Sequence, residues 1–329
     1  MEHISIPGIP FAASRIALGT WAIGGWMWGG ADDDNALATV HRALDLGINL
    51  VDTAPVYGFG HSEEIVGRAL EGRRDDVLIA TKVGLDWSGG RPRRNSTPER
   101  LRQELEDSLR RLRTDVIDIY QVHWPDDATP FEVTAETLDA FKREGKIRAI
   151  GVSNFDVAQM ERFATAAPIA TVQPPYNLFE RGAEDKILPY ARTHGIVALT
   201  YGALCRGLLT GKMTEDATFE GDDLRKMDPK FKPSRRGQYL AAVSELDTLA
   251  RDKFGKSVLA LAVRWILDQD NTVALWGARR PSQLDAVPEI ITGWHVDPAT
   301  MAEIDGILAR TITDPVGPEF MAPPRTKAA

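Results

Sequence analysis

The chain has 329 residues, 43% of them hydrophobic and 26% charged, and its 39 basic and 47 acidic side chains give a net charge of −8. This composition is typical of a folded globular protein and lacks the positive charge expected of a nucleic-acid-binding protein. The N-terminus has neither the basic nor the apolar region of a signal peptide, no run of about 18 apolar residues occurs, and the single cysteine, Cys205, excludes an intramolecular disulfide framework.

We therefore expect one cytoplasmic domain, residues 1–329, that binds neither nucleic acid nor membrane. The N-terminal piece, residues 4–10, is typical of a small hairpin that could plug the bottom of a barrel. After it, apolar or β-branched segments alternate with longer amphipathic ones. Eight strands are expected at residues 15–18, 49–52, 77–81, 117–122, 148–151, 170–173, 197–201 and 272–276.

Helices are expected over residues 97–112, 239–254 and 258–268, and from about positions 33, 62, 131, 156, 181 and 283. Strands that alternate with helices predict parallel pairing. Closure into a single (β/α)8 barrel, the TIM barrel, removes both edges of the sheet, and a doubly wound open sheet is the competing topology. The long segment after the seventh strand, residues 208–237, is a candidate lid because loops of this length are usually functional.

Active sites of α/β barrels lie at the carboxyl ends of the strands. Polar side chains stand at these ends, one or two to a strand, and they are Asp52, Lys82, His123, Ser153, Asn154, Gln173 and Tyr201. Because the strand ends meet at one face of a barrel, we expect these side chains to converge on one site.

Tyr57 follows Asp52 on a short loop that contains Pro55 and Gly58. An aspartate paired with Lys82 would hold the ammonium in place, and a nearby ammonium favours the phenolate and lowers the pKa of a tyrosine. Tyr57 is therefore a candidate acid or base, and His123 is suited to orient and polarise a substrate carbonyl beside it.

The motifs around these residues resemble the aldo-keto reductase superfamily. The resemblance covers nearly the whole chain and is carried by LGTW at 18–21, NLVDTAPVYGFGHSEEIVGRAL at 49–70, IATK at 79–82, DIYQVHWPD at 118–126, GKIRAIGVSNF at 145–155 and RGLLTGK at 206–212. It implies that Asp52, Tyr57, Lys82 and His123 form a catalytic tetrad. It also implies a carbonyl reductase of the bacterial general-stress or glycerol dehydrogenase and glyceraldehyde reductase types.

The cofactor implied by the resemblance is NADP(H). Ser153, Asn154 and Gln173 would hold the nicotinamide amide, Tyr201 would stack on the ring, and backbone amides of residues 202–208 would meet the pyrophosphate. The segment LWGARRPSQLDAV, residues 275–287, resembles the part that grips the adenosine 2′-phosphate, and arginines there favour NADP over NAD. The full set of expected cofactor contacts is Thr20, Trp21, Ser153, Asn154, Gln173, Tyr201, Gly202, Leu204, Arg206, Gly207, Lys212, Gly277, Arg279 and Gln283, with Arg280 beside them.

Tryptophans in loops after strand ends are expected to wall the substrate pocket, and they are Trp21, Trp26, Trp28, Trp87 and Trp124. Short polyols and their aldehydes, such as glyceraldehyde, are the expected substrates of a monomeric enzyme. Two alternatives stay open. One is a non-catalytic barrel that senses NADP(H) and regulates a partner, and the other is a metal-dependent barrel hydrolase, for which the histidines are sparse.

Overall fold

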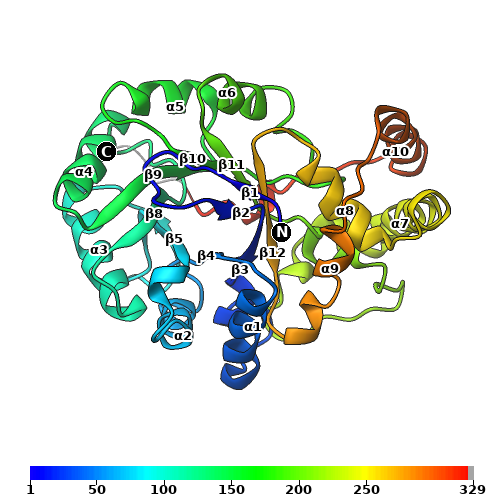
Figure 1. Cartoon of the computed structure of the whole chain (residues 1–329), viewed down its shortest axis with the longest axis horizontal. Helices are drawn as coiled ribbons and strands as arrows, with labels where there is room; N and C mark the ends of the chain where they lie inside the picture. The colour runs from blue at the N-terminus through cyan, green and yellow to red at the C-terminus, as the bar shows by residue number, and fades with distance from the viewer. Residues whose placement is uncertain (325–329) are drawn as a thin grey trace.

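The computed structural model describes residues 1–324, in which a closed barrel of parallel strands forms the centre of the molecule (Figure 1). The strands of the barrel follow the order β10-β11-β12-β3-β4-β5-β8-β9. They are β3 Ile16–Gly19, β4 Leu50–Asp52, β5 Leu78–Val83, β8 Ile117–Val122, β9 Ile147–Ser153, β10 Thr171–Gln173, β11 Val197–Thr200 and β12 Thr272–Gly277. All eight expected strands are confirmed, and the open-sheet alternative is wrong.

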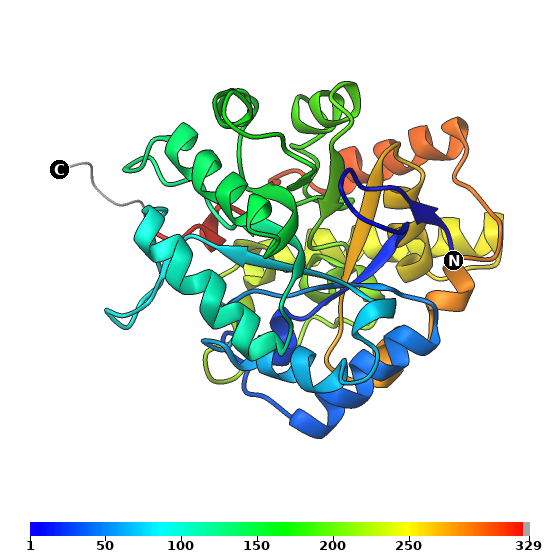
Figure 2. The ribbon, with the colours of Figure 1, turned by 60° about the vertical axis from the view of Figure 1, so that its left-hand side comes forward.

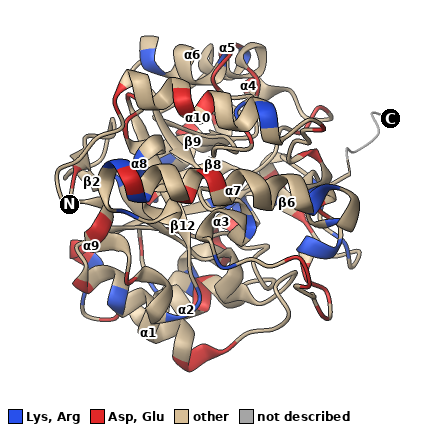
Figure 3. Cartoon of the chain, turned by 90° about the vertical axis from the view of Figure 1, so that its right-hand side faces the viewer, with Lys and Arg blue, Asp and Glu red and all other residues tan. Residues whose placement is uncertain are grey.

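Helices surround the strands, as Figure 1 shows. They are α1 Asp33–Asp45, α2 His61–Ala69, α3 Pro98–Leu112, α4 Phe131–Arg143, α5 Val157–Ala164, α6 Ile187–Thr193, α7 Pro233–Phe254, α8 Val258–Leu267, α9 Val287–Ile290 and α10 Pro298–Thr311. Lysines and arginines are interspersed with aspartates and glutamates over the side that carries α7 and α8 (Figure 3). Within residues 1–324 no helix is both long and apolar enough to cross a membrane.

Three helix predictions need correction, and one helix was missed. The helix expected from position 181 begins later, at Ile187, and α7 begins at Pro233 rather than near 239 because a proline suits the first helical position. The helix expected from position 283 is instead the short 3-10 turn η6 Pro281–Leu284 followed by α9. The helix α10 was not anticipated.

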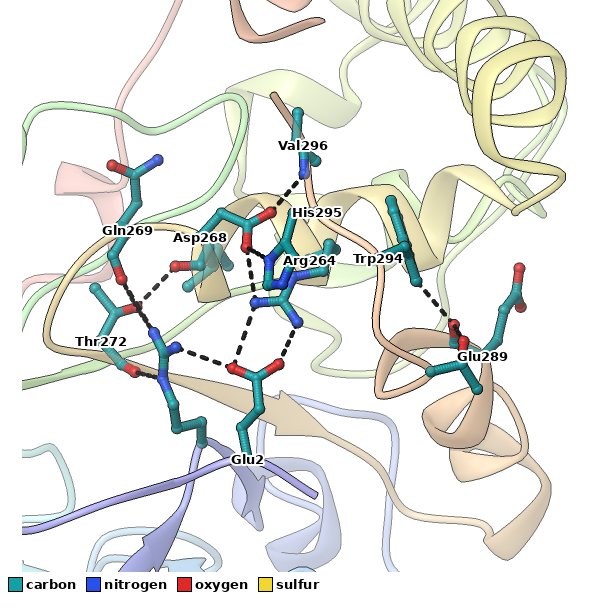
Figure 4. Close-up of polar contacts among 12 residues, drawn as sticks. Glu2, Arg264, Asp268, Gln269, Thr272, Glu289, Trp294, His295 and Val296 are labelled. Carbon is teal, nitrogen blue, oxygen red and sulfur yellow. Dashed lines mark hydrogen bonds and ion pairs between the residues drawn. The ribbon is translucent and has the colours of Figure 1, made fainter. Parts of the chain in front are cut away.

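The N-terminal hairpin plugs one end of the barrel. It pairs β1 His3–Ile4 with β2 Ala13–Ser14, so its second strand lies beyond the expected residues 4–10. Ile6 packs in the same apolar cluster as the inward-facing side chains of the barrel. Glu2 ties the hairpin down, because its carboxylate pairs with Arg15 at 3.1 Å and also with Arg264 of α8 (Figure 4). Figure 2 shows the hairpin at one end of the barrel and the red C-terminal segment at the other.

Two loop segments shape the opposite, carboxyl end of the barrel. After β5 a small antiparallel flap pairs β6 Leu85–Asp86 with β7 Arg93–Arg94, an element that the sequence did not predict. The expected lid, residues 208–237, is here called the strap. It contains the short turns η4 Leu224–Lys226 and η5 Pro229–Phe231 and runs into the first turn of α7.

The tip of the strap is fastened to the loop between β3 and α1. The Asp222 carboxylate accepts hydrogen bonds from the Met27 amide at 2.7 Å and the Gly29 amide at 3.2 Å. The Leu224 amide donates to the Met27 carbonyl at 2.9 Å. The strap therefore links the loop after β11 to the loop after β3, two strands that are separated in the barrel only by β12.

Candidate active site

A cavity of about 830 Å³ opens at the carboxyl end of the barrel, the end opposite to the hairpin. This volume lies in the range of small-molecule and cofactor sites. Its lining includes most of the site residues expected from the sequence, namely Thr20, Trp21, Trp28, Asp52, Tyr57, His123, Trp124, Ser153, Asn154, Gln173, Tyr201, Gly202, Leu204, Arg206, Gly207, Lys212, Gly277, Arg279 and Gln283.

The four expected catalytic residues come together at the floor of this cavity. The Lys82 ammonium lies 2.7 Å from the Asp52 carboxylate and also donates to the Thr53 carbonyl at 2.9 Å, and both members of the ion pair are buried. The Lys82 Nζ is 5.0 Å from the centre of the Tyr57 ring. The His123 ring approaches Tyr57 edge-on, with 5.9 Å between ring centres. Asp52 and Lys82 are thus buried below Tyr57 and His123, which face the cavity.

Two glycines allow the Tyr57 loop to sit this deeply. A side chain at Gly24 would place its Cβ 2.5 Å from the Tyr57 carbonyl carbon, and one at Gly58 would place it 2.1 Å from the Gly24 carbonyl oxygen. Gly58 also has a φ of +67°, a conformation that favours glycine. The backbone of the Tyr57 loop therefore packs directly on the turn after β3.

The electrostatics of Tyr57 differ from the sequence-based expectation. Loss of hydration, with a further contribution from the Asp52 charge, raises the pKa of the Tyr57 phenol well above its ordinary value. The prediction that Lys82 lowers this pKa is therefore wrong, because burial of the phenol dominates and the Asp52 charge acts in the same direction. The phenol is held in its protonated form, which is the form that donates a proton.

His123 is poised as a neutral hydrogen-bonding group. Loss of hydration, together with the charge of Lys82, moves the pKa of His123 well below its ordinary value. Burial also lowers the pKa of Lys82, while the Asp52 carboxylate acts in the opposite direction. A neutral imidazole has one N–H donor and one acceptor, so His123 can orient a carbonyl oxygen without itself transferring charge.

A chain of amide and hydroxyl groups lies beside the tetrad. The Tyr201 hydroxyl donates to Asn154 Oδ1 at 2.9 Å, and Asn154 Nδ2 donates to the His123 carbonyl at 3.0 Å. The Ser153 hydroxyl donates to the Gln173 carbonyl at 2.9 Å. Gln173 Nε2 in turn donates to Asp52 at 2.8 Å, so this side chain holds the Asp52 carboxylate in place and also lines the cavity.

The loop after β11 has the backbone that an anion site needs. Gly202 and Gly207 have φ values of +78° and +99°, and Cys205 and Arg206 between them have +43° and +54°. Backbone amides in such unusual conformations can form a concave cradle for phosphate oxygens. The Arg206 side chain, however, is buried and points into ion pairs with Glu180 and Asp228, so its charge is neutralised within the protein.

A group of cationic side chains lies along the outer part of the cavity. Arg279 lines it and donates to the Trp28 carbonyl at 2.6 Å, and Arg225 and Lys212 line it as well. Burial, together with the charges of Arg280 and Arg225, lowers the pKa of Arg279. Gln283 Oε1 accepts the backbone amides of Arg279 and Arg280 at 2.9 and 3.0 Å, so this residue fixes the arginine loop.

Four of the five expected tryptophans line the cavity, and they are Trp21, Trp26, Trp28 and Trp124. Trp21 stacks on Tyr57 with 5.8 Å between ring centres, and Trp28 meets Trp21 edge-on at 5.8 Å. Trp124 lines the cavity beside His123, and so does Trp26. Trp87 does not line the cavity. It packs against a small apolar cluster formed by Ala54, Val56 and Leu85, and the Arg100 guanidinium lies over its ring.

The structure also brings in residues that the sequence reasoning missed. Gln121 lies two positions before His123 on β8, and its amide approaches Asp52 at 3.4 Å. The period of two in a strand places residues 121 and 123 on one face and was the available signal. Phe320, Met321 and Pro323 of the C-terminal part also line the cavity, and no local pattern pointed to them.

The residues present fit a nicotinamide dinucleotide. The indole Nε1 atoms of Trp21 and Trp28 are buried and have no hydrogen-bond partner within residues 1–324, although both rings line the cavity. The cationic group and the amide cradle suit phosphates. Over the same part of the chain, no group of three or more His, Cys, Asp and Glu side chains is arranged to hold a metal ion.

A parallel barrel whose carboxyl end joins a buried Asp–Lys pair to a tyrosine and a histidine defines an oxidoreductase site of the aldo-keto reductase type. The aldo/keto reductase family model matches residues 15–309. The chain belongs to this family.

Individual relatives agree with this assignment. The aldo-keto reductase YhdN of Bacillus subtilis (strain 168) is 58% identical over 98% of both chains. The structure of the glycerol dehydrogenase AKR11B4 from Gluconobacter oxydans matches with a TM-score of 0.89 and 57% identity, over 97% of this chain and 99% of that one. The NADH-specific methylglyoxal reductase of Escherichia coli (strain K12) is 36% identical over 95% of this chain and 99% of its own length.

Proposed function

We propose that this oxidoreductase uses NADP(H) to reduce aldehydes and ketones to alcohols, and to catalyse the reverse reaction, with short polyol aldehydes such as glyceraldehyde as substrates. The observation that carries the proposal is the convergence of the Asp52–Lys82 ion pair, Tyr57 and His123 at one end of the cavity. When bound, the nicotinamide supplies or accepts the hydride.

The residues of the chain handle the proton and the position of the carbonyl. Tyr57 donates the proton of its phenol to the carbonyl oxygen. Because the pKa of this phenol is raised, the phenol is protonated before the reaction begins. His123 orients the same oxygen by a hydrogen bond. The buried Asp52–Lys82 ion pair sets the electrostatic environment of Tyr57 and His123. The tryptophans that line the cavity exclude water from it.

The choice of cofactor rests on Arg279 and Arg280. Both lie at the outer part of the cavity or beside it, where charge-assisted hydrogen bonds to a 2′-phosphate are favourable. The methylglyoxal reductase relative is described as NADH-specific, so the phosphate contact has to be tested on this chain. Ser153, Asn154 and Tyr201 would hold the nicotinamide end.

The choice of small polyol substrates rests on two observations. The glycerol dehydrogenase with 57% identity covers nearly the whole chain. In addition, the unpaired indole N–H groups of Trp21 and Trp28 offer donors to hydroxyl oxygens at the cavity wall. We also propose that the enzyme acts as a monomer.

The test compares the Tyr57→Phe variant with the wild type. NADPH oxidation with glyceraldehyde should fall by about 10²–10⁴-fold because the proton donor is lost, while NADPH binding measured by fluorescence stays close to that of the wild type. Turnover within a few-fold of wild type would remove Tyr57 from the mechanism. Tight NADPH binding by a wild-type protein that reduces no carbonyl would instead favour the sensing alternative.

The pH profile is a second readout of the same residue. Reduction needs the protonated phenol, and the raised pKa of Tyr57 keeps this form populated across the neutral range. Alcohol oxidation needs the ionised phenol as the base, so its rate should rise toward alkaline pH. Identical pH optima for the two directions would argue against Tyr57 as the shared acid and base.

A further inference from the structure

Four buried charged side chains form a cluster outside the catalytic tetrad. They are Glu180, Arg206, Asp228 and Lys230, and each side chain is at most 4% exposed. Arg206 Nε lies 2.6 Å from Asp228, its Nη2 pairs with Glu180, and Lys230 Nζ lies 2.7 Å from Glu180. Two cations and two anions balance in formal charge, as burial requires. We call these four residues the buried ion cluster.

The cluster joins segments that are distant in the sequence. Glu180 lies in the connection after β10, Arg206 in the phosphate-facing loop after β11, and Asp228 and Lys230 at the end of the strap. Side chains that share one ion network cannot move independently without leaving a charge buried and unpaired. The loop and the strap therefore have a common anchor.

The same cations reach the C-terminal segment, defined here as residues 316–323. Lys230 Nζ donates to the Gly317 carbonyl at 3.1 Å, and the Arg206 guanidinium lies 5.6 Å from the centre of the Phe320 ring. The Val316 amide donates to the Tyr239 hydroxyl at 3.2 Å. The two cations thus contact the segment on either side of residue 318.

The C-terminal segment is a wall of the catalytic cavity. Phe320, Met321 and Pro323 line the cavity that also holds Tyr57 and His123. These three side chains are apolar, so they offer contacts to a non-polar substituent of a substrate rather than to its carbonyl group. The contact surface exists only if the segment keeps its place over the cavity.

We propose that Lys230, acting with Arg206, is a positioning residue for the carbonyl substrate, because it seats the C-terminal segment that contacts the substrate's apolar substituent. The inference rests on the proposed reductase function. Lys230 is fully buried and does not line the cavity, so its effect on the substrate passes through the Gly317 carbonyl and the neighbouring Phe320. The substrate range then includes aldehydes with an aromatic group in addition to small polyol aldehydes.

The experiment uses Lys230→Met, with Arg264→Met as the matched control. Arg264 is equally buried and paired with Glu2 and Asp268, but it lies at the hairpin end of the barrel (Figure 4). Lys230→Met should raise the KM for benzaldehyde by about three- to tenfold, the range of a lost aromatic contact. At saturating NADPH, the KM for glyceraldehyde should change much less. Arg264→Met should lower the melting temperature without this selectivity.

Phe320→Ala tests whether Lys230 acts through the segment. Phe320→Ala alone should also raise the benzaldehyde KM, and the double variant should be no worse than the poorer single variant. The proposal would be overturned if the fold-increases in the benzaldehyde KM of the two single variants multiplied in the double variant. It would also be overturned if Lys230→Met and Arg264→Met raised this KM equally. If Lys230→Met does not fold, an unchanged benzaldehyde KM in Phe320→Ala overturns it.

Hydrogen exchange separates this inference from the proposed function, because it needs no turnover. Lys230→Met should speed amide exchange in residues 316–323, and Arg264→Met should not. Faster exchange in a protein that reduces no carbonyl would reject the reductase function but support the role of Lys230 in holding the C-terminal segment. Unchanged exchange in an active Lys230→Met variant would reject the role of Lys230 in holding the C-terminal segment and leave the reductase function in place.

Discussion

The close approach of Gly24 to the Tyr57 loop gives a sharp test of how the catalytic tyrosine is positioned. In Gly24→Ala the new Cβ would lie 2.5 Å from the Tyr57 carbonyl carbon, whereas ordinary contacts begin at 3.4 Å, so the loop must move by 0.9 Å. A misplacement of about 1 Å at a reacting group can cost roughly 10²-fold in rate. The overpacking itself should destabilise the fold by about 1–3 kcal/mol.

The control is Gly89→Ala in the flap. Neither glycine has a positive φ, and a Cβ at Gly89 would meet nothing within 4 Å, so the two substitutions differ mainly in the clash with Tyr57. Steady-state kinetics with glyceraldehyde should show kcat/KM reduced by about 10²-fold for Gly24→Ala and nearly unchanged for Gly89→Ala. Near-equal values for the two variants would refute the claim that this contact sets the position of Tyr57.

Three other predictions follow from the site and its supports. Replacing Arg279 and Arg280 by alanine should raise the KM for NADPH far more than that for NADH, and equal increases would refute the 2′-phosphate contact. NADPH should protect the strap from proteolysis. The Asp222→Ala variant should show weaker protection because two hydrogen bonds to the β3–α1 loop are lost. Cleavage at the same rate with and without NADPH would reject the proposal that the strap covers the bound cofactor. Burial raises the pKa of Glu104 from 4.5 to about 8, so the folded protein retains a proton that the unfolded chain releases, and stability should fall between these pH values by at most roughly 5 kcal/mol. Glu104→Gln should flatten this slope in thermal melts, and an unchanged slope would exclude Glu104 as its source.

Side-chain periodicity and strand-end chemistry were enough to predict the barrel and the polar residues that meet at the candidate site. Most of the eight strands have a polar residue at or just beside their carboxyl end, and parallel strands in a barrel bring those ends to one face. The sequence alone therefore predicts that Asp52, Lys82 and His123 lie in one site. The helix expected from about position 156 begins at Val157, and in the structure the Asp156 side chain caps it.

What the sequence could not determine depends on contacts between distant segments. The flap of β6 and β7 has only two residues in each strand, too few for a periodic pattern, and its place depends on contacts with α3. The prediction for Tyr57 had the wrong direction because the pKa of a phenol depends on its hydration and on the nearby Asp52 charge, which are set only by folding.

Arg206 also shows what the sequence could predict and what depended on the tertiary structure. The motif RGLLTGK predicted that Arg206 contacts a cofactor, and the residue does line the cavity, but a motif gives no information about where a long side chain ends. The fold brings Glu180 and Asp228 to its guanidinium, and a buried cation must pair with the anions within its reach. The sequence by itself determined the strands and the residues at their ends, while the tertiary structure decided which charges are paired inside the protein and which remain free to meet a ligand.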